Sequence, residues 1–380
     1  MKIGILTMNY TSNYGGILQC VALQRILESY KHEVFVIRYS ESKKSKIKKS
    51  FKNFANIDSW HILYHKFRNI IKPQKRESIS LIKHCRDFIK SNINYTELCD
   101  EDTIGPLIER LNLDIVIIGS DKVWGAMADH KLIYFGEWHP AFKGKLCSYA
   151  ACTSRSEIPS FNKKKIIYYI NKFNYLSVRD KHTYNLLQPY TKTTIKQVLD
   201  PTFLYDFKEY IEKDKKISPY ILTYILGEEI QGGHKKALDK IKTKCGNIPV
   251  ISIIIGNKYN NIIQYSDKII DDASPLDWIN LIKNACFVYT DSFHGTVFSL
   301  KYQKLFVTFY KEKYRASRLI SLKEDYNIPY NIVESVDQIN VTKLYEIDFN
   351  KVQCRINENK IKSLDFIESI LSDENVIAKK

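Results

Sequence analysis

The sequence contains no Cys-x-x-Cys pair, and its eight cysteines are scattered singly at positions 20, 85, 99, 147, 152, 245, 286 and 354. This spacing argues against a zinc site or a disulfide framework and predicts a reduced, cytoplasmic protein. Because no run of about eighteen apolar residues occurs, we expect no transmembrane helix. The first seven residues predict one short strand and lack the layout of a signal peptide.

Two nucleotide-binding patterns are also missing. Neither a GxGxxG fingerprint nor a Walker loop follows the first strand, which weakens a dinucleotide or P-loop interpretation. The net charge of +16 indicates an anionic partner, such as nucleic acid, a membrane surface, or a phosphorylated or carboxylated small molecule. No base-stacking or groove-reading pattern is evident, so we do not expect nucleic acid among the partners.

What the chain does contain is an alternation of strands and helices. Its 380 residues, 44% apolar and 26% charged, predict a globular protein of two domains. Apolar runs predict strands at 2–8, 33–39, 114–121, 145–151, 174–180, 194–199, 220–226, 249–256, 287–289 and 305–309, mostly separated by helices. This order is typical of α/β domains with parallel sheets.

Pro201 interrupts the regular structure, so we place the domain boundary there. The prediction is an N-terminal domain at 1–200 and a C-terminal domain at 201–350. The remaining segment, 351–380, contains an amphipathic helix at about Arg355–Leu371 that we expect to pack back on the first domain.

A basic insertion is predicted within the first domain, at about 41–100. Its most charged part is the lysine-rich segment 43–52. A basic amphipathic segment of this kind indicates either peripheral contact with an anionic membrane or a solvated excursion from the fold.

Polar residues and glycines follow several of the predicted strands. They are Asn13, Tyr14, Gly15, Gly16, Ser120, Asp121, Ser177, Arg179, Ser292 and His294. Because ligands bind α/β sheets beyond the carboxyl ends of the strands, this shared placement predicts one site between the domains. Each glycine alone fits either a tight turn or a close approach of the backbone to a ligand.

The stretch Cys286–Leu300 combines these features most clearly. A buried strand ends at Asp291, Ser292 is placed to cap the next helix, and His294 falls in its first turn. A helix N-terminus favours anions, and a histidine there can donate or accept a proton. The same pattern also fits a capped helix with an incidental histidine. Asp291 is predicted either to orient His294 or to cap the turn.

These stretches resemble the polysaccharide pyruvyl transferase family over most of the chain outside the lysine-rich insertion. The resemblance rests on short motifs in a specific order: Asn13–Gln19, Ile118–Trp124, Ser148–Ala151, Leu176–Asp180, Val198–Thr202, Asp291–Thr296 and the later Arg318. It implies two facing Rossmann-like domains, similar to the GT-B glycosyltransferase architecture. It also implies transfer of pyruvate from phosphoenolpyruvate onto two hydroxyls of a glycan or lipid-linked sugar as a ketal, with release of phosphate.

The implied pathway is the synthesis of capsular, exopolysaccharide or cell-wall glycans, at the cytoplasmic face of the membrane. No metal and no cofactor are expected, because phosphoenolpyruvate is itself the donor substrate. On this reaction we expect His294 and Arg179 to be catalytic, as acid/base and anion clamp. The expected donor-binding residues are Ser292, Gly295, Thr296, Arg318 and Lys313. The expected acceptor-binding residues are Asn13, Tyr14, Gly15, Gly16, Ser120 and Asp121.

Two other functions remain open at this point. A nucleotide-sugar glycosyltransferase of the same architecture would need an acid for the ribose, for which Glu228 with Glu229 or Asp271 with Asp272 are the candidates. A non-catalytic membrane- or glycan-binding protein is supported mainly by the lysine-rich segment. The polar cluster at the strand ends argues against it, because an adhesion surface does not need a buried histidine and arginine.

Overall fold

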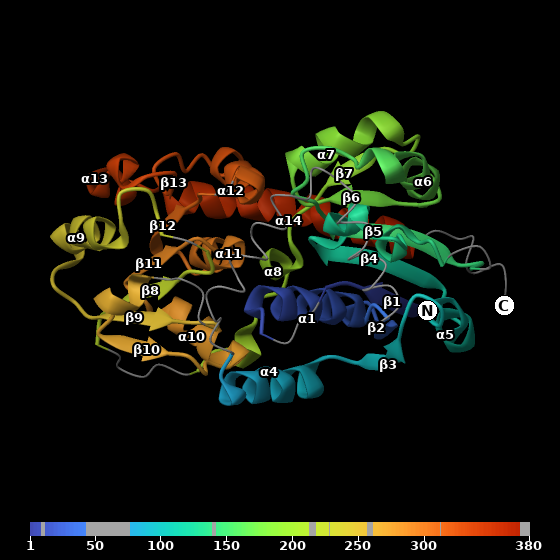
Figure 1. Cartoon of the computed structure of the whole chain (residues 1–380), viewed down its shortest axis with the longest axis horizontal. Coiled ribbons are helices and arrows are strands. Elements are labelled where there is room, and N and C mark those ends of the chain that lie inside the picture. The colour runs from blue at the N-terminus through green and yellow to red at the C-terminus, as the bar shows by residue number, and fades with distance from the viewer. Residues whose placement is uncertain are drawn as a thin grey trace.

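The computed structural model describes residues 1–8, 12–42, 77–138, 142–212, 218–227, 229–256, 261–311 and 313–372, without the side chains of 313–315. Two parallel sheets organise this part of the chain (Figure 1). The sequence therefore predicted the fold class correctly. The lysine-rich segment 43–52, with its proposed membrane contact, and Glu228 lie outside the described residues.

The first sheet has the strand order β3-β2-β1-β4-β5-β6-β7, with every described pair parallel. Its strands are β1 (Lys2–Leu6), β2 (Glu33–Tyr39), β3 (Tyr95–Cys99), β4 (Ile115–Asp121), β5 (Lys145–Ala151), β6 (Leu176–Val178) and β7 (Ile195–Gln197). The central strands β4 and β5 are buried along their whole length, as their continuous apolar runs predict.

Helices connect these strands and cover the sheet. They are α1 (Tyr14–Ser29), α4 (Ile79–Asn92), α5 (Ile104–Leu111), α6 (Ser160–Ile170) and α7 (Lys181–Leu187), with 3-10 turns η2 (Val123–Ala128), η3 (Ile133–Phe135) and η5 (Gln188–Tyr190). Helix α1 packs on β2 and β4 and also on elements of the second half.

The predicted insertion at about 41–100 is too long. Its last part forms helix α4 and strand β3, and β3 is the edge strand that pairs with β2. Helix α4 buries Leu81, Cys85, Phe88 and Ile89, a helical spacing that the many surrounding lysines and arginines obscured.

The second sheet has the order β10-β9-β8-β11-β12-β13 and is also parallel. Its strands are β8 (Ile221–Tyr224), β9 (Val250–Ile253), β10 (Lys268–Ile270), β11 (Phe287–Thr290), β12 (Leu305–Phe309) and β13 (Ile332–Val333). The short strands β10 and β13 were not predicted. Both lie at the edges of the sheet, where two or three residues leave too weak a pattern in the sequence.

The helices of the second half are α8 (Pro201–Leu204), α9 (His234–Cys245), α10 (Pro275–Asn284), α11 (Phe293–Lys301), α12 (Lys313–Asp325), α13 (Val341–Leu344) and α14 (Phe349–Leu371), with 3-10 turns η6 (Lys208–Tyr210), η7 (Asn261–Tyr265) and η8 (Val336–Gln338). Helix α14 begins six residues before the predicted Arg355 and is capped by Asp348. It runs across the molecule and reaches the first sheet, where Phe366 contacts the ring of Tyr149 at 6.4 Å (Figure 1).

A continuous hydrophobic core joins the two halves. Tyr14, at the start of α1, stacks on Trp278 of α10 at 5.7 Å and contacts Tyr224 of β8 at 5.8 Å. The hydroxyl of Tyr14 donates to the carbonyl of Ala273 at 2.7 Å. This contact fixes the N-terminus of α1 against the second sheet. It thereby sets the distance between the carboxyl edges of the two sheets.

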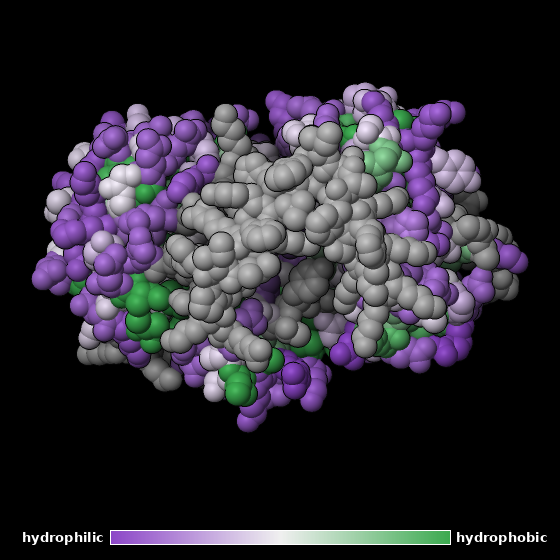
Figure 2. All heavy atoms as spheres, in the orientation of Figure 1, coloured by the Kyte–Doolittle hydropathy of each residue, from purple (hydrophilic) through white to green (hydrophobic). Residues whose placement is uncertain are grey.

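The visible surface of the described residues is mostly hydrophilic, with small scattered apolar groups (Figure 2). None of the described helices is both long and apolar enough to span a membrane.

Candidate functional site

The N-termini of α1 and α11 meet between the two sheets. The imidazole of His294, in the first turn of α11, lies directly against Gly15, in the first turn of α1. A β-carbon at Gly15 would stand 2.0 Å from Nδ1 of His294, so only glycine fits there. Two residues that are far apart in the sequence, each following a strand of a different sheet, thus form one wall of the site.

Arg179 lies beside this contact, at the carboxyl end of β6, and is almost completely buried. Its two terminal nitrogens donate to Asp200 Oδ2 at 2.5 Å and to Asp121 Oδ1 at 2.8 Å. The second nitrogen also lies 3.1 Å from Sγ of Cys152. Burial raises the pKa of the Cys152 thiol to about 11, so we expect the thiol to be neutral.

Asp200 is the residue that links Arg179 to His294. Its Oδ2 lies 3.5 Å from Nε2 of His294, while its Oδ1 accepts from the amide and hydroxyl of Thr202 at 3.0 and 2.6 Å. Burial alone would raise the pKa of Asp200, but His294 and Arg179 hold it well below its usual range. Burial also opposes ionisation of Asp121, and again the nearby positive charges, led by Arg179, lower its pKa. Both carboxylates are therefore ionised.

Phe293 gathers three cationic or titratable groups around one ring. The guanidinium carbons of Arg179 and Arg318 lie 4.3 and 5.4 Å from its centroid, and the His294 ring packs edge-on at 5.1 Å. Cations on an aromatic face are attracted by its quadrupole, which helps to hold both arginines in place.

Arg318, from α12, differs from Arg179 in its partners. It is only 7% exposed, yet it forms no hydrogen bond or ion pair with any described residue, and its Nε is buried without a partner. Burial, followed by repulsion from Arg179, lowers its pKa, although a guanidinium stays charged at neutral pH. Asp121 and Asp180 are near enough to attract this charge, but neither is bonded to it. A buried charge without a directly bonded counter-ion is costly, so this group is well suited to bind an anionic ligand.

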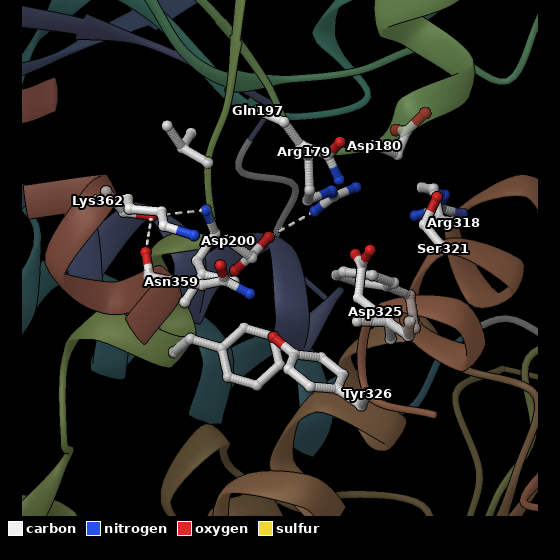
Figure 3. A pocket seen from close by; sticks show the side chains of 16 residues that line it. Arg179, Asp180, Gln197, Asp200, Arg318, Ser321, Asp325, Tyr326, Asn359 and Lys362 are labelled. Carbon is white, nitrogen blue, oxygen red and sulfur yellow. Dashed lines mark hydrogen bonds and ion pairs between the residues drawn. The ribbon is translucent and has the colours of Figure 1, made fainter. Parts of the chain in front are cut away.

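A cavity of about 240 Å³ lies in front of these arginines (Figure 3). Arg318 and Asp325 of α12 stand on one side, and Asn359 and Lys362 of α14 stand on the other. Burial, followed by the charge of Glu324, raises the pKa of Asp325. The cavity therefore combines fixed cations with an acid that holds its proton to a higher pH than usual.

Three residues that the sequence placed in the site have side-chain polar groups that are buried and bonded to other parts of the protein. Tyr14 is fully buried in the interdomain core, with its hydroxyl bound to a backbone carbonyl. Ser120 is fully buried, and its hydroxyl donates to the carbonyl of Ala150 at 3.2 Å. Thr296 donates to the carbonyl of Ser292 at 2.9 Å and contacts the Thr308 hydroxyl at 2.7 Å. Since their polar groups are already satisfied, we withdraw all three as binding residues.

Ser292 forms the helix cap that the sequence predicted, and Asn13, which was expected to bind the acceptor, also caps a helix. Ser292 Oγ accepts the amide of Gly295 at 3.2 Å, and Asn13 Oδ1 accepts the amide of Gly16 at 3.2 Å. The amides of Gly295 and Gly16 are thus bound within their own helices, and the groups left for a ligand are those nearer the start of each helix.

Asp291 does not orient His294. Its carboxylate accepts the backbone amides of Leu226 and Gly227, both at 2.6 Å, and so fixes the loop after β8 to the start of α11. The group beside His294 is Asp200 instead. In the sequence, Asp200 stands out only as part of a family motif at a strand end, and that strand-end position was the available signal. Phe293, Cys152 and Asp325 were missed.

Some predictions fall outside what can be placed. The side chain of Lys313 is not described, although its backbone opens α12. Among the described residues, no group of three or more histidine, cysteine, aspartate or glutamate side chains could hold a metal ion. The predicted absence of a cofactor stays a prediction.

The sequence matches the family model of the polysaccharide pyruvyl transferases over residues 13–313. The chain belongs to this family. The match spans His294, Arg179 and Asp200, and it ends before Arg318. As a pyruvyl transferase family member, the chain carries its buried arginine, histidine and aspartate cluster inside the region that defines the family. A search of curated protein sequences found no match.

Several solved structures share the architecture of this pyruvyl transferase family member. The S. aureus MnaA–UDP co-structure has a TM-score of 0.55 at 11% identity, covering 100% of this chain and 98% of that chain. UDP-GlcNAc 2-epimerase from Methanocaldococcus jannaschii has a TM-score of 0.52 at 14% identity, covering 92% and 93%. Arabidopsis thaliana UGT89C1 complexed with UDP has a TM-score of 0.51 at 8% identity, covering 98% of both chains. At these identities the likeness shows the fold alone, a GT-B arrangement of two α/β domains.

Proposed function

We propose that this protein transfers pyruvate from phosphoenolpyruvate onto two hydroxyls of a glycan or lipid-linked sugar, forming a ketal and releasing phosphate. The observation that carries the proposal is Arg318, a buried guanidinium with no hydrogen-bonding partner among the described residues, at the wall of a cavity that Arg179, Asp200 and Phe293 also line. Phosphoenolpyruvate carries a carboxylate and a phosphate, and a planar guanidinium binds either group through paired hydrogen bonds.

The reaction makes specific demands on the site. The vinyl carbon of phosphoenolpyruvate gains a proton, one sugar hydroxyl attacks the neighbouring carbon, and the carbon–oxygen bond to phosphate breaks. A second hydroxyl then closes the ketal. Of the two protons that leave the hydroxyls, one is balanced by the new methyl group and the other by the released phosphate. An acid, a base and stabilisation of the leaving phosphate are therefore needed.

The side chains divide these tasks. Arg318 holds one anionic group of the donor, and the start of α11 supplies helix N-terminal amides for the same purpose. His294, held against Gly15 and 3.5 Å from Asp200, moves the proton. Arg179 does not act as the free anion clamp expected from the sequence, because Asp121 and Asp200 occupy its terminal nitrogens. It fixes those carboxylates and adds positive charge, and its buried Nε has no hydrogen-bonding partner among the described residues.

Calorimetric titration of the purified full chain with phosphoenolpyruvate, at fixed ionic strength, tests the proposal. We expect saturable binding that Arg318→Gln weakens by about a hundredfold, since loss of a charge-assisted hydrogen bond to a buried anion costs about 3 kcal/mol. Arg110→Gln is the matched control, because it removes the same charge from an exposed pair with Glu97.

A panel of nucleotide sugars is titrated under the same conditions. Selective binding of phosphoenolpyruvate, followed by mass spectrometric detection of a pyruvyl ketal on an added glycan, supports the proposal. Selective binding of a nucleotide sugar, or phosphoenolpyruvate binding that Arg318→Gln and Arg110→Gln affect equally, overturns it.

A further inference from the structure

A second cavity, of about 470 Å³, lies at the carboxyl edge of the second sheet. Its walls are the 229–233 loop, which follows β8, together with Tyr310, Lys311 and Glu334, which follow β12 and β13. None of these residues contributes to the arginine site. A volume of this size is in the range of pockets that hold small ligands, roughly 300 Å³ and above.

The cavity is next to the catalytic edge in the fold. Strands β8 and β12 are the two neighbours of β11, whose end leads directly to Ser292 and His294. The loop after β8 is also fixed to the start of α11, because Asp291 accepts the amides of Leu226 and Gly227 at 2.6 Å. The cavity and His294 therefore lie at the same edge of the second sheet, after neighbouring strands.

The loop that forms the wall is held in one conformation. Gly232 and Gly233 have φ angles of +96° and +93°, which residues with a side chain rarely adopt. The carbonyl of Gln231 accepts the amide of Val336 at 2.9 Å, and a β-carbon at Gly232 would stand only 3.1 Å from Val336. The cavity is thus preformed, which lowers the entropy lost when a ligand binds.

The charge of this cavity is opposite in sign to that of the arginine site, because carboxylates predominate among its described charged residues. Glu229 accepts the amide of His234 at 2.7 Å and the side chain of Asn261 at 2.8 Å. Burial opposes its ionisation, but these hydrogen bonds lower its pKa below the usual range. Because this carboxylate already caps α9, the helix N-terminus does not attract an anion. Among the described residues that line the cavity, Glu229 and Glu334 carry two negative charges against the one positive charge of Lys311, so phosphate is disfavoured.

The remaining groups suit a neutral ring with several hydroxyls. Each carboxylate oxygen accepts more than one hydrogen bond, so Glu229 and Glu334 can still receive hydroxyl donors. The Tyr310 hydroxyl donates to Glu334 Oε1 at 2.6 Å, which fixes its half-buried ring at the wall. An aromatic ring offers an apolar surface for the C–H face of a sugar.

We propose that this cavity binds a sugar ring of the acceptor glycan, an inference that rests on the function proposed above. The shared chemistry is a ring with neighbouring hydroxyls, which both a glycan and the ribose of a nucleoside possess. The placement of the cavity favours the glycan, because it lies at the same sheet edge as His294 and is not lined by the arginines that would hold an anionic donor.

The test is saturation-transfer NMR on the full chain with methyl glycosides of galactose, glucose, mannose and N-acetylmannosamine, and with uridine, which lacks phosphate. We expect at least one glycoside to bind, and Tyr310→Ala to weaken it about tenfold. Glu334→Gln should weaken it too, and it preserves the shape of the wall if Tyr310→Ala proves unstable. Tyr330→Ala is the matched control, since Tyr330 is 42% exposed and lines a different cavity.

Three results overturn the proposal: no glycoside binds, Tyr310→Ala and Glu334→Gln both bind it as tightly as the wild type, or uridine alone binds and is lost in these variants. Phosphoenolpyruvate is titrated against the same proteins as a separate readout. Unchanged donor binding in Tyr310→Ala, with weakened glycoside binding, supports two distinct subsites. Failure of the wild type to bind phosphoenolpyruvate counts against the proposed function, whatever the glycoside result.

Discussion

The imidazole of His294 packs on the bare α-carbon of Gly15, so that the first turns of two helices from different sheets are in direct contact. The space for a β-carbon at Gly15 is already filled, with Nδ1 only 2.0 Å from that position. Nε2 of the same ring points to Asp200 at 3.5 Å. The ring is therefore confined on one side by a glycine of one domain, while its buried Nε2, which forms no hydrogen bond with a described residue, faces the aspartate that precedes α8.

This contact predicts the effect of Gly15→Ala. The added methyl group must displace His294 or separate the two helices. Overpacking of this kind costs about 1–3 kcal/mol of stability. A displaced catalytic group can lower the rate by about a hundredfold. Denaturant unfolding and pyruvyl transfer would be measured together.

Gly105→Ala is the control, because a β-carbon there would meet the carbonyl of Trp138 at an ordinary 3.5 Å. Within α5 that substitution should leave the activity unchanged and raise the stability slightly, since alanine is the better helix former. Equal activity of Gly15→Ala and Gly105→Ala would contradict the role assigned to the His294 contact.

Asp200→Asn tests the central carboxylate. The substitution keeps the shape but removes the charge that compensates the buried Arg179, and it weakens the contact with His294. Breaking a buried ion pair on one side typically costs about 3–5 kcal/mol, although Asp121 still pairs with Arg179 and should keep the loss near the lower end. Both the free energy of unfolding and the transfer rate should fall.

The matched control is Asp206→Asn, six residues after Asp200 in the sequence. It changes an exposed ion pair between Asp206 and Lys208. Surface pairs contribute little, so neither stability nor activity should change measurably. If Asp200→Asn behaved like Asp206→Asn, the arginine–aspartate–histidine cluster would not be the organising feature of the site.

Much of the fold follows from local patterns in the sequence. Continuous apolar runs such as Ile115–Ile118 indicate buried parallel strands, and Ser292 marks a helix start that the structure contains. The edge strands β10 and β13 were missed because strands of two or three residues are too short to show an alternation of apolar and polar residues. Helix α4 was missed because its apolar stripe is narrow and lies next to a strongly basic segment.

The site was predictable in its location and less so in its contacts. Strand ends identify which residues meet, and Arg179, His294 and Asp121 do come together. Which of them pairs with which depends on the relative position of the two domains, and no local pattern encodes that. Tyr14 illustrates the difference: it occupies a loop–helix junction that suits a ligand, yet the closure of the domains buries its ring against Trp278.

His234 gives the protein a pH dependence outside the site. It is fully buried, with Nδ1 2.8 Å from the hydroxyl of Tyr289, and burial lowers its pKa to about 4. The unfolded chain takes up this proton near pH 6.5, whereas the folded protein resists it until about pH 4. Stability is therefore fully present above pH 6.5 and declines as the pH falls toward 4, by about 3 kcal/mol from this residue.

Unfolding in denaturant at a series of pH values checks this prediction. His234→Gln removes the titrating group, so its stability should change less between pH 6.5 and 4 than that of the wild type, even if it is lower throughout. Parallel pH profiles for the two proteins would contradict the assignment. Asp200 and Asp121 have lowered pKa values in the folded protein. The stability that they contribute is therefore lost only when the pH falls below the pKa of an ordinary aspartate carboxyl.

We assign proton transfer to His294 and donor binding to Arg318, and variants of the two residues distinguish these roles. His294→Asn should lower the rate of pyruvyl transfer by about 10²–10⁴, the usual contribution of an acid or base, while the dissociation constant of phosphoenolpyruvate changes much less than in Arg318→Gln. His84→Asn is the control, because His84 is exposed and only contacts the carbonyl of Asp272 at 2.7 Å. If His294→Asn kept the full rate and lost donor affinity instead, the histidine would be an anion ligand. The proton would then have to come from a different group, and Asp325, which lines the cavity with Arg318, has a raised pKa.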